Sequence, residues 1–250
     1  MTYCIGISLD AGLVLTSDSR TNAGIDHVST YSKMHRCETN PDRCLVILSA
    51  GNLATTQGVI QQVRRDVQEG QPRNLNTLNY LADIAEYLGD VLVNKIRKHT
   101  EQTGFVPDAT LMLGGQVHGR NPNMYMIYPQ GNYISTSDET PYLQLGESKY
   151  GKPVLDRFLT RETSLEDAAI CSLISMDSTM KSNASVGPPI EMLIYPRDQF
   201  RTPRHYKFEA EDPYLIAIRH EWANHLNRAF RSMPRFEGHH PLSNGDVNIF

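Results

Sequence analysis

The sequence contains no long apolar run. No stretch of its 250 residues approaches the roughly 18 consecutive apolar residues that a membrane-spanning helix needs, so we exclude a membrane-spanning protein. The first residues, Met-Thr-Tyr-Cys-Ile-Gly-Ile, lack the basic start, the apolar stretch and the small-residue cleavage site of a secretory signal. We therefore expect a cytoplasmic protein.

Cysteines are few, and none is arranged for metal binding. The four form no CxxC pair, and in a reducing compartment we expect buried thiols rather than disulfides. His220 and His225 flank a sequence similar to the HExxH zinc helix, but five residues place the second histidine about 140° around the helix from the first. We therefore expect no metal and no cofactor.

Basic residues are not in excess. The chain has 24 Lys and Arg against 28 Asp and Glu, which gives a net charge of −4. No long basic run provides the electrostatic footprint that a nucleic-acid-binding protein needs. We therefore expect no nucleic-acid partner.

The first third of the chain has the pattern of β-strands. Large apolar residues alternate with small or polar ones from Tyr3 to Leu9, and Leu13 to Leu15 follow a turn that contains glycine. This pattern predicts a hairpin of two strands. A second pair is predicted at Lys33 to Cys37 and Cys44 to Ser49, because turn-forming residues separate them.

Helical and strand patterns then alternate in pairs. The periodicity predicts helices, then strands, then helices, then one strand. The predicted helices are Leu53 to Glu69, Thr77 to His99, Lys152 to Leu159 and Ser164 to Lys181. The predicted strands are Ala109 to Val117, Met124 to Ile134 and Ile190 to Tyr195. This order predicts an α+β fold, a four-layer αββα sandwich of two antiparallel sheets.

No linker or internal repeat divides the chain, so we expect one domain over residues 1–250. Its last part, at about 205–250, is predicted to contain a C-terminal helix from Pro213 to Phe230 and then a polar tail.

Threonine stands at position two. Its small side chain permits removal of the initiator methionine, which would make Thr2 the mature N-terminus. A free α-amine has an unperturbed pKa of about 7.7–8.0 and can accept the hydroxyl proton, so one residue can supply both nucleophile and base. Taken alone, Thr2 is far more simply explained as an ordinary second residue, and only its context supports a catalytic role.

That context is a set of three motifs. They are Thr-Ser-Asp18-Ser-Arg20, Tyr-Ser-Lys33-Met and Leu-Ser-Ala-Gly51-Asn-Leu-Ala. In this order, the motifs resemble those of proteasome β subunits and of the bacterial HslV peptidase. The likeness is greatest to the bacterial ancestral-beta-subunit (Anbu) family, and it spans about residues 2 to 195.

The resemblance implies an N-terminal-nucleophile hydrolase with Thr2 as its nucleophile. It further implies that Lys33 favours the deprotonated hydroxyl, that Asp18 keeps Lys33 charged, and that the Gly51 N–H stabilises the oxyanion. Without the resemblance, Asp18 and Lys33 would be a structural ion pair and Gly51 a turn residue.

Supporting residues follow from the same resemblance. It implies supporting positions for Arg20, Ser182 and Ser185, although the two serines equally suit a polar helix C-terminus. The segment from Leu145 to Ser148 resembles the family's Gly-Ser-Gly segment, but Glu147 intervenes and shifts the serine, so Ser148 receives no catalytic role.

The expected function is threonine-type hydrolysis of peptide or protein substrates. The resemblance implies a self-associated assembly of like subunits, in a ring or a ring-like spiral. A non-catalytic structural subunit is one alternative, but it would need neither Thr2 nor the Asp18–Lys33 pair. Transfer of the acyl group to an amine, as in a transpeptidase, is another, and only product analysis separates it from hydrolysis.

Overall fold

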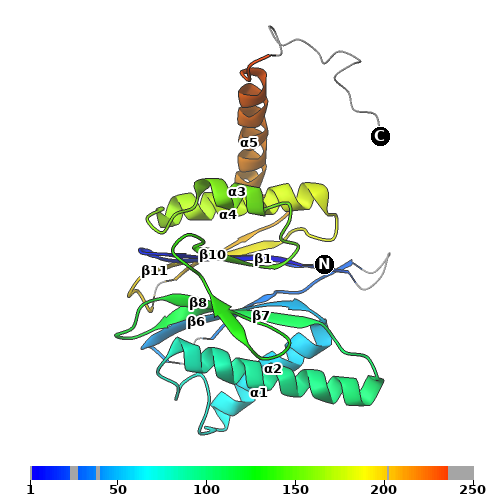
Figure 1. Ribbon diagram of the computed structural model, residues 1–250, viewed down its shortest axis with the longest axis vertical. Helices are drawn as coiled ribbons and strands as arrows, with labels where there is room; N and C mark the ends of the chain where they lie inside the picture. The colour runs from blue at the N-terminus through cyan, green and yellow to red at the C-terminus, as the bar shows by residue number, and fades with distance from the viewer. Residues whose placement is uncertain (1, 23–27, 38–39, 202, 236–250) are drawn as a thin grey trace, which may run out of the picture.

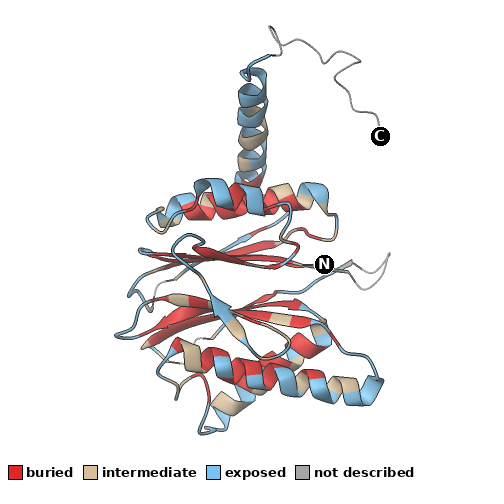
Figure 2. Cartoon of the chain, in the orientation of Figure 1, coloured by how far each residue is buried: buried red, intermediate tan, exposed pale blue. Residues whose placement is uncertain are grey.

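Two five-stranded antiparallel sheets lie face to face between two layers of helices (Figure 1). The computed structural model describes residues 2–22, 28–37, 40–201 and 203–235 of the chain. This arrangement confirms the predicted α+β sandwich. Buried residues make up most of the inner strands of both sheets and the helix faces that turn towards them (Figure 2).

The first sheet carries the start of the chain near its middle. Its strand order is β10-β1-β2-β11-β12, with β1 Tyr3–Leu9, β2 Gly12–Asp18, β10 Tyr142–Gly146, β11 Ile190–Pro196 and β12 Arg204–Phe208. Its outer face packs on α3 (Lys152–Phe158) and α4 (Leu165–Ser182) through an apolar cluster that includes Ile5, Ile7 and Leu173.

The second sheet has the order β5-β6-β7-β8-β9. Its strands are β5 Met34–Arg36, β6 Arg43–Gly51, β7 Ala109–Val117, β8 Asn123–Ile127 and β9 Tyr133–Ser135. Its outer face packs on α1 (Leu53–Gln68) and α2 (Leu81–Thr103) through Ile47, Ile84 and Leu88, among others. The inner faces of the two sheets meet in a third cluster, which includes Leu15, Leu48 and Met112. A short hairpin, β3 (Arg20–Asn22) and β4 (Val28–Thr30), follows β2.

Two predicted elements had wrong bounds. The strand expected from Met124 to Ile134 is the hairpin of β8 and β9, because Tyr128 to Asn132 form a turn with Gly131 at φ 87°. The helix expected from Thr77 begins at Leu81, because the Asn74 side chain and backbone oxygens accept hydrogen bonds from residues 76–78 and hold that segment in a turn. The same helix continues past its expected end at His99 to Thr103.

The last helix, α5 (Pro213–Arg231), confirms the predicted C-terminal helix and stands out from the α3–α4 layer (Figure 1). Asp212 caps its first turn, and Leu215 is its one buried residue. Most of the predicted tail, residues 236–250, lies outside the described residues. Among the described helices, none has the length and apolar character to cross a membrane.

Two helical glycines provide a test of the packing of α2 on the β8–β9 turn. A Cβ on Gly89 would meet the Gly131 carbonyl oxygen at 2.3 Å, whereas a Cβ on Gly58 in α1 would meet only the flexible Lys95 side chain at 3.7 Å. Alanine is the better helix former by about 1 kcal/mol. We expect Gly58→Ala to raise the free energy of unfolding by about 0.5–1 kcal/mol, and Gly89→Ala to lower it by about 1–3 kcal/mol.

Urea denaturation of the two variants and the unmodified protein measures this difference. Equal changes for both variants would contradict the close backbone contact between α2 and the turn.

Candidate active site

Asp18 ends β2 directly beside the start of β1. The register of the β1–β2 hairpin pairs Cys4 with Ser17, so Asp18 comes opposite Tyr3. The Tyr3 backbone N–H donates to Asp18 Oδ1 at 3.0 Å. Hairpin geometry therefore explains why an aspartate sixteen residues along the chain returns to the peptide that follows Thr2.

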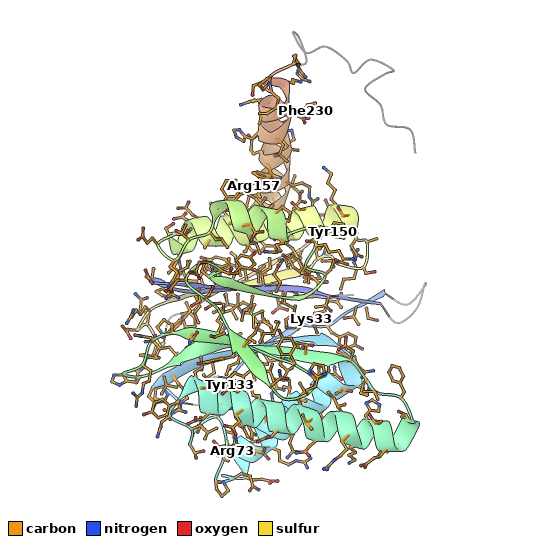
Figure 3. All side chains as sticks on the ribbon, in the orientation of Figure 1. Lys33, Arg73, Tyr133, Tyr150, Arg157 and Phe230 are labelled. Atoms are coloured by element: carbon orange, nitrogen blue, oxygen red, sulfur yellow. The ribbon has the colours of Figure 1, made fainter. Side chains whose placement is uncertain are left out.

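Lys33 reaches Asp18 from the second sheet. It lies just before β5, where its carbonyl accepts a hydrogen bond from Ser49 N–H of β6, and Figure 3 places it between the two sheets. Lys33 Nζ lies 2.6 Å from Asp18 Oδ1 and donates to the Arg20 carbonyl at 2.7 Å. The side chains of Lys33 and Asp18 are 7% and 0% exposed, so the two charges pair out of contact with water.

Opposing effects act on the Asp18 carboxyl. Burial raises its pKa, while the Lys33 ammonium and the N–H groups of Tyr3 and Gly187 lower it. The Gly187 N–H donates to Asp18 Oδ2 at 3.3 Å. Both carboxylate oxygens are therefore hydrogen-bonded, which is the condition under which a buried carboxylate can remain ionised beside a lysine.

Thr2 is half-buried and lies one peptide from this ion pair. Its carbonyl accepts a hydrogen bond from the Glu147 N–H at 2.8 Å, and the next N–H, that of Tyr3, shares Asp18 Oδ1 with Lys33. The structure thus brings Thr2, Asp18 and Lys33 together. Met1 lies outside the described residues.

Gly51 closes β6 just before α1. Its φ of 99° is in the region that favours glycine, and a Cβ there would meet the Asp108 carbonyl oxygen at 2.2 Å. Asn52 then caps α1 by accepting from Thr55 N–H. Gly51 lies two residues beyond Ser49, which contacts Lys33. Its role as an oxyanion donor remains a prediction.

Arg20 supports the loop that follows α4. Its Nη1 donates to the Ala184 carbonyl at 2.7 Å, and its backbone N–H donates to the Gly187 carbonyl at 3.3 Å. Ser182 is the exposed last residue of α4, and the half-buried Ser185 donates its backbone N–H to Asn183 Oδ1. Supporting roles for the hydroxyls of Ser182 and Ser185 also remain predictions.

The sequence motifs assigned no role to Glu147 and Asn183. The Glu147 side chain is buried, and its Oε2 accepts a hydrogen bond from Asn183 Nδ2 at 3.1 Å. The neighbouring Ser148 is held through its backbone, because its carbonyl accepts a hydrogen bond from Gln144 Nε2. The only signal in the sequence was that Glu147 displaces the serine of the family segment.

No three His, Cys, Asp or Glu side chains of the described part of the chain gather closely enough to hold a metal ion. The arrangement has groups that nucleophilic catalysis uses: a hydroxyl on Thr2, an ammonium held by a carboxylate that also binds the next N–H along the chain, and a backbone N–H at the end of a strand.

Comparisons with known proteins agree on one family. The protein-family model described as "Proteasome subunit" matches residues 2–195 of the chain. The chain is 26% identical over 209 residues to a proteasome subunit beta of Haloquadratum walsbyi, covering 83% of this chain and 79% of that protein.

Solved structures point the same way. Anbu (ancestral beta-subunit) from Yersinia bercovieri superposes with a TM-score of 0.88 at 42% identity, covering 94% of this chain and 99% of that one. The helical assembly of the Anbu complex from Pseudomonas aeruginosa gives a TM-score of 0.88 at 41% identity, covering 94% and 98%.

The buried ion pair can be tested through stability. In Lys33→Met, Asp18 loses its cation but stays buried, so we expect the free energy of unfolding to fall by about 3–5 kcal/mol near pH 8. Without Lys33, the pKa of Asp18 rises further above its unfolded value. Stability from such a group is present at low pH and is lost as the pH rises through the folded-state pKa. The loss relative to the unmodified protein should therefore be smaller at pH 5 than at pH 8.

Urea denaturation at both pH values measures the effect, with the double variant Asp18→Asn, Lys33→Met as the control that removes both charges. We expect the double variant to be more stable than Lys33→Met at pH 8. A pH-independent loss, or no recovery in the double variant, would contradict the ion pair.

Proposed function

The chain belongs to the proteasome subunit family and groups with its Anbu members. From this premise we propose that it hydrolyses amide bonds of peptides or proteins in the cytoplasm. The proposed nucleophile is Thr2, freed as the mature N-terminus. The observation that carries the proposal is the buried Lys33–Asp18 ion pair, which shares Asp18 Oδ1 with the N–H of the peptide following Thr2.

The proposed reaction has two steps. The Thr2 α-amine takes the proton from the Thr2 hydroxyl, directly or through a water molecule, and Oγ attacks the substrate carbonyl. The Lys33 ammonium favours the deprotonated oxygen, and the Gly51 N–H donates to the oxyanion. As the tetrahedral intermediate collapses, the leaving amine takes the proton from the α-ammonium, and an ester to Thr2 remains. The Thr2 α-amine then deprotonates the water molecule that hydrolyses this ester and restores Thr2.

Two alternatives differ from this proposal in measurable ways. A structural subunit on the same fold has no need of a buried lysine beside Thr2, because burying an ion pair stabilises a fold little compared with apolar residues of the same volume. A transpeptidase would form the same ester and pass the acyl group to an amine, so its product would contain a new amide bond.

Assembly with like subunits is the second part of the proposal. The similar Anbu complex from Pseudomonas aeruginosa is a helical assembly. Tyr87 and Leu88 of α2 offer no surface for such contacts, because they are 5% and 0% exposed within the chain's own core. Helix α5 is the better candidate. Beyond Trp222, which stacks edge-on against Phe158, its exposed apolar residues are Leu226, Phe230 and, just past its end, Met233.

The nucleophile can be tested directly. Intact-mass measurement of active protein should show a chain that begins at Thr2, because an amide-blocked amine cannot act as the base. With fluorogenic peptides, Thr2→Ala should lose at least about 10³-fold in turnover, while Thr2→Ser should keep measurable turnover because it retains a hydroxyl. Full activity in protein that retains Met1, or in Thr2→Ala, would contradict the proposal.

The assembly can be tested through α5. Phe230 lies at the far end of α5 from the sheets (Figure 3). We expect light scattering at micromolar concentration to show a multimer of the unmodified protein. The double variant Leu226→Glu, Phe230→Glu should give smaller species, because charges would replace an apolar contact.

The control, Asn227→Glu, adds a charge at an exposed polar site between these residues and should leave the multimer intact. A monomeric mass for the active unmodified protein would rule out the assembly, and an intact multimer of the double variant would rule out the role of α5.

A further inference from the structure

Glu147 lies opposite Thr2 across the strand pair β1–β10. The register of this pair ends with Tyr3 opposite Gly146, so the next residues outward are Thr2 and Glu147. Their backbones remain in contact, because the Glu147 N–H donates to the Thr2 carbonyl at 2.8 Å. Gly146 makes this approach possible: its φ is 77°, and a Cβ there would meet the Thr2 carbonyl oxygen at 1.9 Å.

The Glu147 side chain is buried but has only a neutral partner among the described residues. It is 7% exposed, and the Asn183 amide donates to its Oε2 at 3.1 Å. Asn183 itself is fixed, because its N–H donates to the Thr179 carbonyl and its Oδ1 accepts from Ser185 N–H. A buried carboxylate with one neutral partner is stabilised when a cation meets its remaining oxygen.

Removal of Met1 would create a cation on Thr2, the residue whose carbonyl accepts the Glu147 N–H. We propose that Glu147 is a positioning residue, whose carboxylate holds the freed α-ammonium of Thr2 and makes the amine more basic. The inference rests on the proposed processing at Thr2, and it goes beyond the proposed reaction by naming the group that orients and tunes the base. The Asn183 amide donates to one carboxylate oxygen and leaves the other for the ammonium.

The basicity of the amine would then reflect opposing charges. Two residues along β1, the charged groups that act on Cys4 are Lys33 ahead of β5, Asp18 on β2 and Glu191 on β11. Lys33 favours the neutral amine, and the carboxylates favour the ammonium. Asp18 is already bonded to Lys33, and Glu191 is engaged by Ser19 and His205. Glu147 is thus the carboxylate that is free to bond the amine directly.

The test measures the pKa of the Thr2 amine, whether or not the protein turns over substrate. Each variant is produced as a ubiquitin fusion and released by a deubiquitinase, so that every chain begins at Thr2. The rate of acetylation of the N-terminal amine by acetic anhydride is followed against pH by mass spectrometry of the N-terminal peptide. Glu147→Gln keeps the shape and the Asn183 contact but removes the charge.

We expect Glu147→Gln to lower the pKa of the amine by about one unit or more, because an opposite charge at contact distance shifts a pKa by roughly 1–3 units. Glu147→Asp, which retains the charge, should lower the pKa of the amine less than Glu147→Gln does. The control, Glu162→Gln, makes the same charge change at an exposed position and should leave the pKa unchanged. In the Glu147→Gln variant, the base-dependent limb of any hydrolysis should move to lower pH.

An amine pKa in Glu147→Gln equal to that of the unmodified protein would overturn the proposal and leave Glu147 a structural partner of Asn183. The same shift in Glu162→Gln would also overturn it, because the effect would then be a long-range one. If Glu147→Gln lowers the pKa while the unmodified protein hydrolyses nothing, the positioning role stands and the proposed function fails.

Discussion

The contact between Lys33 and Asp18 is the constraint on which the rest of the site depends. A buried ion pair is tolerated only when its remaining donors and acceptors are satisfied. Here that requirement draws four segments together: the start of β1 through Tyr3 N–H, the Arg20 carbonyl, the loop after α4 through Gly187 N–H, and the approach to β5. Because Lys33 comes from the second sheet and Asp18 from the first, the pair also joins the two sheets at the end where the chain begins.

The periodic parts of this fold could be predicted from the sequence. Alternating residues in β1 and the apolar runs of β6 and β7 indicated buried strands, and the helical period found α1 and α4 within one or two residues. The missed strands lack such a signal. The first four residues of β12 are exposed at a sheet edge, so no apolar alternation marks it. Strand β10 is short, and its pairing with β1 joins residues as far apart in sequence as Tyr3 and Gly146, a contact that no local pattern reveals.

At the site, too, contacts between residues far apart in the sequence were the ones missed. Asp18 and Lys33 were assigned because the motifs that contain them resemble those of the family, and the β1–β2 register explains how Asp18 returns to the start of the chain. Glu147 and Asn183 were not found, because the contact of Glu147 with Thr2 depends on the β1–β10 register, and the contact of Asn183 with Glu147 depends on how the chain leaves α4. Ser182 and Ser185 show the converse. A motif match assigned supporting roles to these serines, which lie at the end of α4 and in the loop after it, but it is Asn183, between them, that makes the described contact to Glu147.

The position of Thr2 follows from the sheet itself. A chain terminus normally frays unless neighbouring structure holds it, and a catalytic terminus must be held at the atom that reacts. Strand β1 lies between β10 and β2, so the residues at its start are bonded on both sides: Tyr3 N–H to Asp18, and the Thr2 carbonyl to Glu147 N–H. An edge strand could hold its terminus from one side only. Placing β1 inside the sheet therefore fixes the backbone of Thr2 through its carbonyl and the next N–H, which is what the proposed reaction at Thr2 requires.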